Sequence, residues 1–199
     1  MKRIGLVVAY DGTNYCGWQT QPNAVTIEEV LNHHLSELLK EEIKVIGASR
    51  TDAGVHALGN VTVFDTSARM PADKISYALN TWMPEDIRIQ DSCEVPSDFH
   101  PRFQKTTKTY EYRILNRRFP DPTRRLNSFF YYYPLDVVKM QEASLYLLGE
   151  HDFKSFCTEK PEVTNTVRTI YSLNVIKEGD MIIIRVTANG FLYNMVRII

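Results

Sequence analysis

Two kinds of hydrophobic pattern alternate along the chain, and this alternation limits the possible folds more than any other feature. Apolar runs rich in β-branched residues predict strands at 3–10, 43–48, 58–64, 87–95, 107–115, 129–133, 170–176 and 181–188. Helices are predicted from 27 to 38, from Pro71 to about Trp82, and from Leu135 to a stop at Gly149. Because strands and helices alternate in both halves, with a hairpin turn at 177–180, we predict an α+β fold.

The first helix has the clearest sequence signature. Thr26 and Glu29 have the spacing of a capping box. The residues that follow place an apolar stripe on one face, and they are Ile27, Val30, Leu31, Leu35 and Leu38. His34 lies on the same face, which predicts a packed histidine rather than a ligand.

The charge of the chain is balanced overall but uneven along its length. With 23 Lys and Arg against 24 Asp and Glu, the 199 residues carry a net charge of -1, which excludes binding of nucleic acid by bulk charge alone. Residues 100–125 nevertheless hold eight Lys or Arg against Glu111 and Asp121. A phosphate-binding face and an ordinary solvated face both explain this segment.

Cysteine and hydropathy patterns limit the location and the metal chemistry. Cys16, Cys93 and Cys157 lie far apart, a spacing that fits neither a disulfide framework nor a zinc site. No apolar run is long enough for a signal peptide or a membrane span. We therefore expect a reduced, cytoplasmic protein with no metal and no membrane contact.

The polar loop at 49–57 lies between two apolar strands, which is where functional residues commonly occur. It contains Arg50 and Asp52, and Gly54 permits the positive φ of a tight turn. Asp52 is a candidate carboxylate for catalysis, with an Asx turn that only caps its own backbone as the alternative.

Five segments in collinear order resemble one known family. They are YDGTNYCGWQTQP (10–22), GASRTDAGVHALGNVTVFDT (47–66), DFHPRFQKTTKTYEYRI (98–114), GEHDFKSF (149–156) and NGFLYNMVRII (189–199). Together they span essentially the whole chain and resemble the tRNA pseudouridine synthase A (TruA) family, with the second segment similar to its catalytic signature.

The resemblance refines the fold prediction. It implies two ferredoxin-like lobes with mostly antiparallel sheets, residues 1–103 and 104–199, and an active cleft between them. Leu192, Met195, Val196 and Ile199 keep helical spacing up to the last residue without a cap. We therefore expect the chain to be truncated at its C-terminus, which leaves the second lobe incomplete.

The resemblance also implies an activity and residue roles. The family isomerises uridine to pseudouridine at positions 38 to 40 of the tRNA anticodon stem-loop, without a cofactor, and forms homodimers. In this sequence Asp52 corresponds to the family's nucleophile, which attacks either the base or the ribose. Tyr110 corresponds to the family's active-site tyrosine, and Arg197 corresponds to the cation that pairs with the aspartate. Arg50 corresponds to an arginine that helps to hold the flipped nucleotide. The basic segment supplies three candidates for phosphate contacts, namely Arg102, Lys105 and Lys108.

Two other functions remain as alternatives. One is a non-catalytic RNA-binding module of similar fold, which would have no use for Asp52, Tyr110 and Arg197 together. The other is a nucleoside hydrolase, but the carboxylates nearest to Asp52 in sequence are Glu42 and Asp65, so the second acid would have to come from elsewhere. The tyrosines at 131–133 fit both contact with RNA and packing at a sheet edge.

Overall fold

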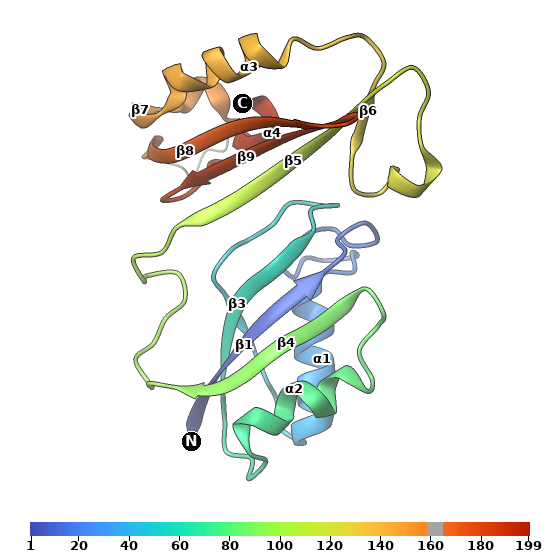
Figure 1. Ribbon diagram of the computed structural model, residues 1–199. Coiled ribbons are helices and arrows are strands. Elements are labelled where there is room, and N and C mark those ends of the chain that lie inside the picture. The colour runs from blue at the N-terminus through green and yellow to red at the C-terminus, as the bar shows by residue number, and fades with distance from the viewer. Residues whose placement is uncertain (159–164) are drawn as a thin grey trace. The chain divides into compact units, whose positions relative to one another are not determined.

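The computed structural model describes residues 1–158 and 165–199. These residues form two compact units, Met1–Gln104 and Lys105–Ile199 (Figure 1). Each unit has its own sheet, with four strands in the first and five in the second. The predicted α+β class with mostly antiparallel sheets is confirmed.

The first unit follows the order strand, helix, strand, strand, helix, strand. Its elements are β1 (Lys2–Tyr10), α1 (Ile27–Leu39), β2 (Ile46–Gly47), β3 (Ala57–Thr66), α2 (Ala72–Asn80) and β4 (Ile87–Val95). The strands lie in the order β2-β3-β1-β4, all antiparallel, and α1 and α2 cover one face of the sheet (Figure 1). This is the ferredoxin-like arrangement.

Helix α1 forms for the reason that its sequence predicts. The Thr26 hydroxyl accepts a hydrogen bond from the Glu29 backbone N–H at 3.4 Å, which caps the first turn. Ile27, Leu31 and Leu35 are fully buried against the inward residues of β1. The stripe anchors the helix on the sheet because burying each large aliphatic side chain contributes about 1.5–3 kcal/mol. His34 carries a lowered pKa because burial disfavours its charged form, as expected for a packed histidine.

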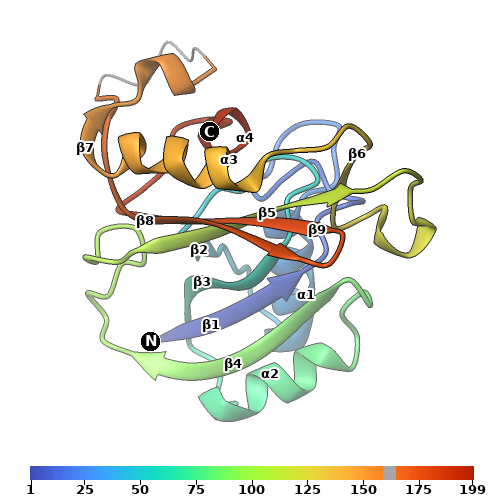
Figure 2. The same cartoon turned by 45° about the horizontal axis from the view of Figure 1, so that its top comes forward.

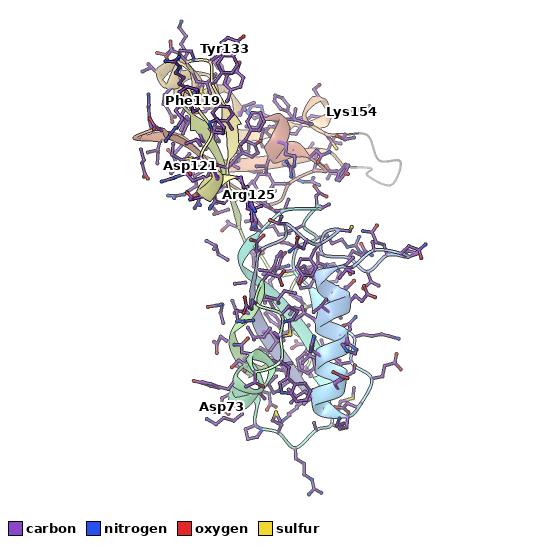
Figure 3. All side chains as sticks on the ribbon, turned by 90° about the vertical axis from the view of Figure 1, so that its right-hand side faces the viewer. Asp73, Phe119, Asp121, Arg125, Tyr133 and Lys154 are labelled. Carbon is purple, nitrogen blue, oxygen red and sulfur yellow. The ribbon has the colours of Figure 1, made fainter. Side chains whose placement is uncertain are left out.

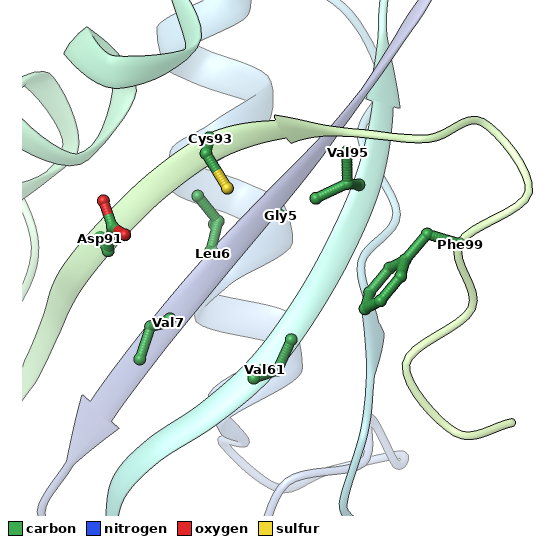
Figure 4. Close-up of a pocket in the computed structure, with 8 residues that line it drawn as sticks. All are labelled: Gly5, Leu6, Val7, Val61, Asp91, Cys93, Val95 and Phe99. Atoms are coloured by element: carbon green, nitrogen blue, oxygen red, sulfur yellow. The ribbon is translucent and has the colours of Figure 1, made fainter. Parts of the chain in front are cut away.

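A shallow pocket of about 80 Å³ is lined by residues of β1, β3 and β4 and by Phe99 (Figure 4). Its lining is mainly apolar, and only Asp91 and Cys93 contribute polar side chains. None of the predicted site residues lines this pocket.

The second unit is built on a sheet of order β6-β5-β9-β8-β7. Its elements are β5 (Lys108–Asn116), a 3₁₀ turn η1 (Pro122–Arg124), β6 (Phe129–Tyr131), α3 (Val137–Ser144), η2 (Leu145–Leu147), β7 (Gly149–Asp152), η3 (Lys154–Phe156), β8 (Val167–Glu178), β9 (Met181–Ala188) and α4 (Met195–Ile198). The only parallel pair among the described strands is β5 with β6. Helix α3 packs on the sheet through β8 (Figure 2).

The helix predicted from Pro71 and the strand predicted at 129–133 are two or three residues shorter in the structure. Two other predicted elements differ more, for identifiable reasons. In the segment 43–48 only Ile46–Gly47 is strand, because the N–H groups of Ile43 and Val45 bind the side chains of Ser36 and Asn32 of α1 instead of a neighbouring strand.

The helix predicted from Leu135 to Gly149 was also too long. It begins at Val137, because Asp136 caps it through the Lys139 N–H at 3.1 Å, and it ends at Ser144, where η2 follows. The Ser144 hydroxyl donates to the Gln141 carbonyl at 2.7 Å, a bond that competes with continued helix.

Within the described residues, no helix has the length and hydropathy that a membrane crossing requires. Over the same part of the chain, no three His, Cys, Asp or Glu side chains cluster as a metal site would need.

Candidate functional site

The loop that connects β2 to β3 carries Asp52 on a tight turn. The Val55 N–H donates to the Asp52 carbonyl at 3.2 Å, and Gly54 has a φ of +75°. The predicted positive φ of Gly54 is therefore confirmed, and a backbone hydrogen bond closes the turn. Asp52 is half-buried and Arg50 is exposed.

Buried polar side chains fix the start of this loop. The hydroxyls of Tyr10 and Thr51 lie 2.8 Å apart, and both residues are buried. Asn60 of β3 binds both backbone groups of Ser49, accepting from its N–H at 3.2 Å and donating to its carbonyl at 3.0 Å. Since each broken buried hydrogen bond costs about 1–3 kcal/mol, this network restricts the residues on both sides of Arg50.

The segment 11–18, which follows β1, supports the loop from a second side. The Trp18 N–H donates to the Thr51 carbonyl at 3.0 Å, and the Gly54 N–H donates to the Tyr15 carbonyl at 3.3 Å. A Cβ on Gly17 would lie 2.6 Å from the Thr51 carbonyl oxygen, and one on Gly12 would overlap the Val55 carbonyl. Only glycine allows the two backbones to approach this closely.

Trp18 fills the space beneath the loop. Its ring is fully buried and lies so near Gly47 that a Cβ there would be 2.5 Å from the ring carbons. The indole therefore occupies the volume that a side chain at position 47 would need, and it packs under the strand that leads into the loop.

Acidic groups of the first unit hold the supporting segment in place. The Tyr15 hydroxyl donates to Asp86 at 2.6 Å, and burial together with this carboxylate raises the pKa of Tyr15. The Asp11 carboxylate lies 2.9 Å from Nδ1 of His56. Burial of Asp11 opposes its ionisation, but hydrogen bonds from Thr13 and the nearby His56 together lower its pKa. Its carboxylate therefore stays charged at neutral pH.

Arg102 lies beside the loop rather than on an isolated surface. Its Nε donates to the Gly47 carbonyl at 2.8 Å. Burial, and then repulsion from Arg50, lower the pKa of Arg102, so the two guanidinium groups lie close enough to interact. Arg3 anchors the segment that carries Arg102, because it pairs with Asp65 at 2.7 Å and donates to the Phe99 carbonyl at 3.1 Å.

The other predicted site residues belong to the second unit. Tyr110 of β5 packs edge to face on Phe191, with ring centroids 5.0 Å apart. Arg197 is exposed on α4, whose Met195 is buried in the same hydrophobic cluster that Tyr110 contacts. Lys105 is exposed ahead of β5, and Lys108 is the first residue of that strand.

The structure thus gathers the predicted residues into two groups. Asp52, Arg50 and Arg102 lie around one loop of the first unit. Tyr110 and the helix of Arg197 share one cluster of the second unit. The first group combines a half-buried carboxylate on a rigid turn with two guanidinium groups, which suits a nucleophile or base acting on an anionic substrate.

Comparison with known proteins agrees with this chemistry. A family model described as tRNA pseudouridine synthase matches residues 6–104 and 143–199. The chain belongs to the tRNA pseudouridine synthase family.

Individual relatives are similar over the full chain. A protein named tRNA pseudouridine synthase A from Thermoanaerobacter sp. (strain X514) is 48% identical over 199 residues, which cover the whole chain and 82% of that protein. Proteins of the same name from Ruminiclostridium cellulolyticum and Halalkalibacterium halodurans are 49% and 48% identical over 200 residues, covering 82% and 76% of their lengths.

For this family member, sequence reasoning missed the residues that support the loop. Gly12, Gly17 and Trp18 lie in the segment 10–22, and their contact with the loop joins positions more than thirty residues apart. The available signal was the pair of glycines on either side of a short polar stretch directly after a strand.

We predict that Gly17→Ala loosens the loop. Gly17 has a φ of +88°, and an added Cβ would meet the Thr51 carbonyl. Gly179 is a matched control, because its φ is +60° but nothing lies within 4 Å of an added Cβ. Gly17→Ala should therefore cost about 1–3 kcal/mol more stability than Gly179→Ala. Amide hydrogen exchange at 49–56 should accelerate only in Gly17→Ala. Equal exchange in both variants would contradict the role of Gly17 in holding the loop.

Proposed function

We propose that this protein isomerises uridine at positions 38 to 40 of the tRNA anticodon stem-loop, with Asp52 as the nucleophile. As a member of the tRNA pseudouridine synthase family, it is an isomerase that acts on tRNA. The observation that carries the proposal is a carboxylate on a turn that the segment 11–18 and Asn60 of β3 hold in place, within a sequence that matches this family.

The reaction needs no external reactant. The bond between ribose C1′ and uracil N1 breaks, the uracil turns, and C1′ bonds to uracil C5. C5 releases its proton and N1 gains one, so the atoms balance. A single carboxylate that attacks either the base or the ribose as a nucleophile can form the covalent intermediate that allows this exchange.

A uridine in a stem must leave the base stack before Asp52 can reach it, which costs a few kcal/mol. In the proposed mechanism, exposed Arg50 holds the flipped nucleotide. The charge of Arg50 contributes to the lowered pKa of Arg102, and two such cations favour an anion placed between them. A tRNA phosphate is the anion that the substrate offers.

The second unit supplies the remaining proposed roles. Tyr110 stacks on the target base, and its edge-to-face contact with Phe191 would fix its ring plane. Arg197 provides the cation that keeps the Asp52 carboxylate ionised in the enzyme–tRNA complex. Lys105 and Lys108, with Arg102, bind tRNA phosphates. By the same resemblance we propose that the protein is a homodimer.

Asp52→Asn is expected to abolish pseudouridine formation while leaving tRNA affinity nearly unchanged. The amide cannot act as the nucleophile, whereas phosphate contacts dominate binding. Tritium release from tRNA labelled at uracil C5 measures turnover, and a filter-binding assay measures affinity. Asp73→Asn, on the exposed face of α2, is the matched control. Turnover of Asp52→Asn within about tenfold of the wild type would reject the nucleophile, because that is only ~1.4 kcal/mol of barrier. Wild-type binding without any tritium release would favour the non-catalytic RNA-binding module.

Arg197→Gln should lower the rate and shift its pH dependence. Without a neighbouring cation the pKa of Asp52 in the enzyme–tRNA complex rises, so the acidic limb of the kcat profile, which reports that complex, should move to higher pH. A loss of protein stability alone would not move the acidic limb. Arg197→Lys keeps a positive charge, so its acidic limb should lie closer to that of the wild type. A lower rate with an unchanged acidic limb would remove Arg197 from the role of Asp52 partner.

Lys105→Ala should reduce the salt dependence of tRNA binding. One lost phosphate contact lowers the slope of log affinity against log salt by about 0.7–0.9. Lys105 is a cleaner test than Arg102, whose side chain also holds the Gly47 carbonyl. Lys139→Ala on α3 serves as the control, since Lys139 is also exposed and pairs with Asp136. Equal slopes for the wild type and Lys105→Ala would show that Lys105 does not contact a tRNA phosphate.

A further inference from the structure

A long connection separates the parallel strands β5 and β6 of the second unit. Twelve residues, 117–128, link the end of β5 at Asn116 to the start of β6 at Phe129. Parallel strands need a crossover of about a dozen residues, so the strand pairing alone accounts for the length of this connection. The family match covers 6–104 and 143–199 and leaves this connection outside. We call residues 117–133 the aromatic arm.

The arm displays a continuous series of exposed rings. Phe129 and Tyr131 are stacked, with centroids 6.5 Å apart, and Tyr131 lies 5.8 Å from Tyr133. The rings of Tyr132 and Tyr133 are 3.8 Å apart. Tyr132, Tyr133 and Phe129 are each more than half exposed. An exposed apolar patch of this kind marks an interaction site.

The rings are held in place rather than mobile on a loose loop. Phe130 points the other way and packs with Leu115 and Met181, which anchors β6 to the sheet. Asn116 donates from its amide to the carbonyls of Tyr131 and Tyr133, at 2.8 and 2.7 Å. Its amide oxygen accepts from the Leu135 N–H at 3.2 Å. A pre-formed platform loses little entropy when a ligand binds.

The same arm carries positive charge. Four arginines, 117, 118, 124 and 125, face one acidic residue, Asp121. The Asp121 carboxylate is engaged by its own turn, because it accepts from the Thr123 N–H at 2.9 Å and from the Thr123 hydroxyl at 2.7 Å. Figure 3 labels Phe119, Asp121, Arg125 and Tyr133 on this part of the second unit.

Two of the arginines pair with no acidic side chain in the part of the chain that the structure describes. Arg118 lies over the Phe119 ring at 5.0 Å, and within the residues that the structure describes neither Arg118 nor Arg125 forms an ion pair. Arg117 and Arg124 reach carboxylates only at 3.5 and 3.8 Å. The surface therefore combines flat apolar faces with uncompensated positive charge.

We propose that the aromatic arm binds unpaired nucleotides of the tRNA substrate, with the rings stacking on bases and Arg118 and Arg125 contacting phosphates. Flat bases and phosphates occur together in single-stranded RNA, and aromatic and arginine side chains are the groups that bind it. This inference rests on tRNA being the substrate, as in the proposed function.

Charge argues against a second copy of this chain as the occupant. In a dimer whose twofold axis passes through the arm, the arm meets itself, so two arginine-rich arms would face each other. Like charges brought together at an interface are unfavourable, whereas a polyanion neutralises them. The proposed homodimer is therefore not expected to be centred on the arm.

The test compares stacking-competent and stacking-incompetent variants. The double variant Tyr131→Leu/Tyr133→Leu should weaken binding of an unmodified tRNA transcript roughly tenfold, whereas Tyr131→Phe/Tyr133→Phe should stay near wild type because the ring faces remain. Tyr146→Leu is the control, since Tyr146 is a highly exposed tyrosine outside the arm.

Arg118→Gln/Arg125→Gln should lower the slope of log affinity against log salt by about 0.7–0.9 for each lost phosphate contact. Photocrosslinking of wild-type protein to tRNA containing 4-thiouridine should label the peptide with residues 129–133, which keeps the proposal testable if a variant misfolds.

The outcomes separate this proposal from the proposed function. Suppose that the wild-type protein modifies tRNA, that the leucine and glutamine variants bind tRNA as well as the wild type, and that no crosslink forms at 129–133. This result would overturn the proposed role of the arm and leave the proposed function intact. Variants that change the sedimenting mass but not tRNA affinity would assign the arm to a second copy and also overturn it. Loss of affinity in the leucine variant of a protein that binds tRNA without isomerising it would support the arm and reject the catalytic proposal. A wild-type protein with no affinity for tRNA would overturn both.

Discussion

The close approach of two backbone segments, 11–18 and 49–56, determines the geometry of the candidate site. It depends on the antiparallel pairing of β1 with β3, in which Tyr10 at the end of one strand lies opposite Ala57 at the start of the other. That register brings both loops to the same end of the sheet. Glycine at positions 12 and 17 then lets the loops touch without side chains between them, and backbone hydrogen bonds join them. Asp52 is consequently positioned by the sheet rather than by its own flexible loop.

Local patterns predicted most elements, because those elements depend on local chemistry. The Thr26 cap, the apolar stripe of α1 and the turn at Gly54 all follow from residues a few positions apart. The strand predicted at 43–48 was mostly wrong for the opposite reason. Ile43 and Val45 are buried as a strand would require, yet α1 side chains from Ser36 and Asn32 take their N–H groups. No periodicity reveals that competition, since it arises only after the helix has packed.

The candidate site was predictable in its residue types but not in its supports. Resemblance identified Asp52 and Arg50, and the charged segment suggested Arg102 as a surface contact. The structure gives Arg102 a bond to the Gly47 carbonyl and places it near Arg50. A guanidinium has five donors, so one can hold the protein backbone while others face an anion. The sequence shows that Arg102 is a cation but not which atoms surround it. Charge patterning therefore does not distinguish a hydrogen bond to the protein backbone from contact with an anion.

Uneven charge lets a nearly neutral protein bind a polyanion in a defined orientation. The chain has a net charge of -1, yet the arm concentrates four arginines while helix α1 and the segment after it carry several glutamates. A uniformly basic surface would attract RNA in many orientations with similar energy. Basic regions instead attract the RNA locally and acidic regions repel it, and the attraction falls with added salt. Neutrality of the whole molecule is therefore compatible with strong local RNA binding, and the distribution of charge, rather than its sum, limits how tRNA can approach.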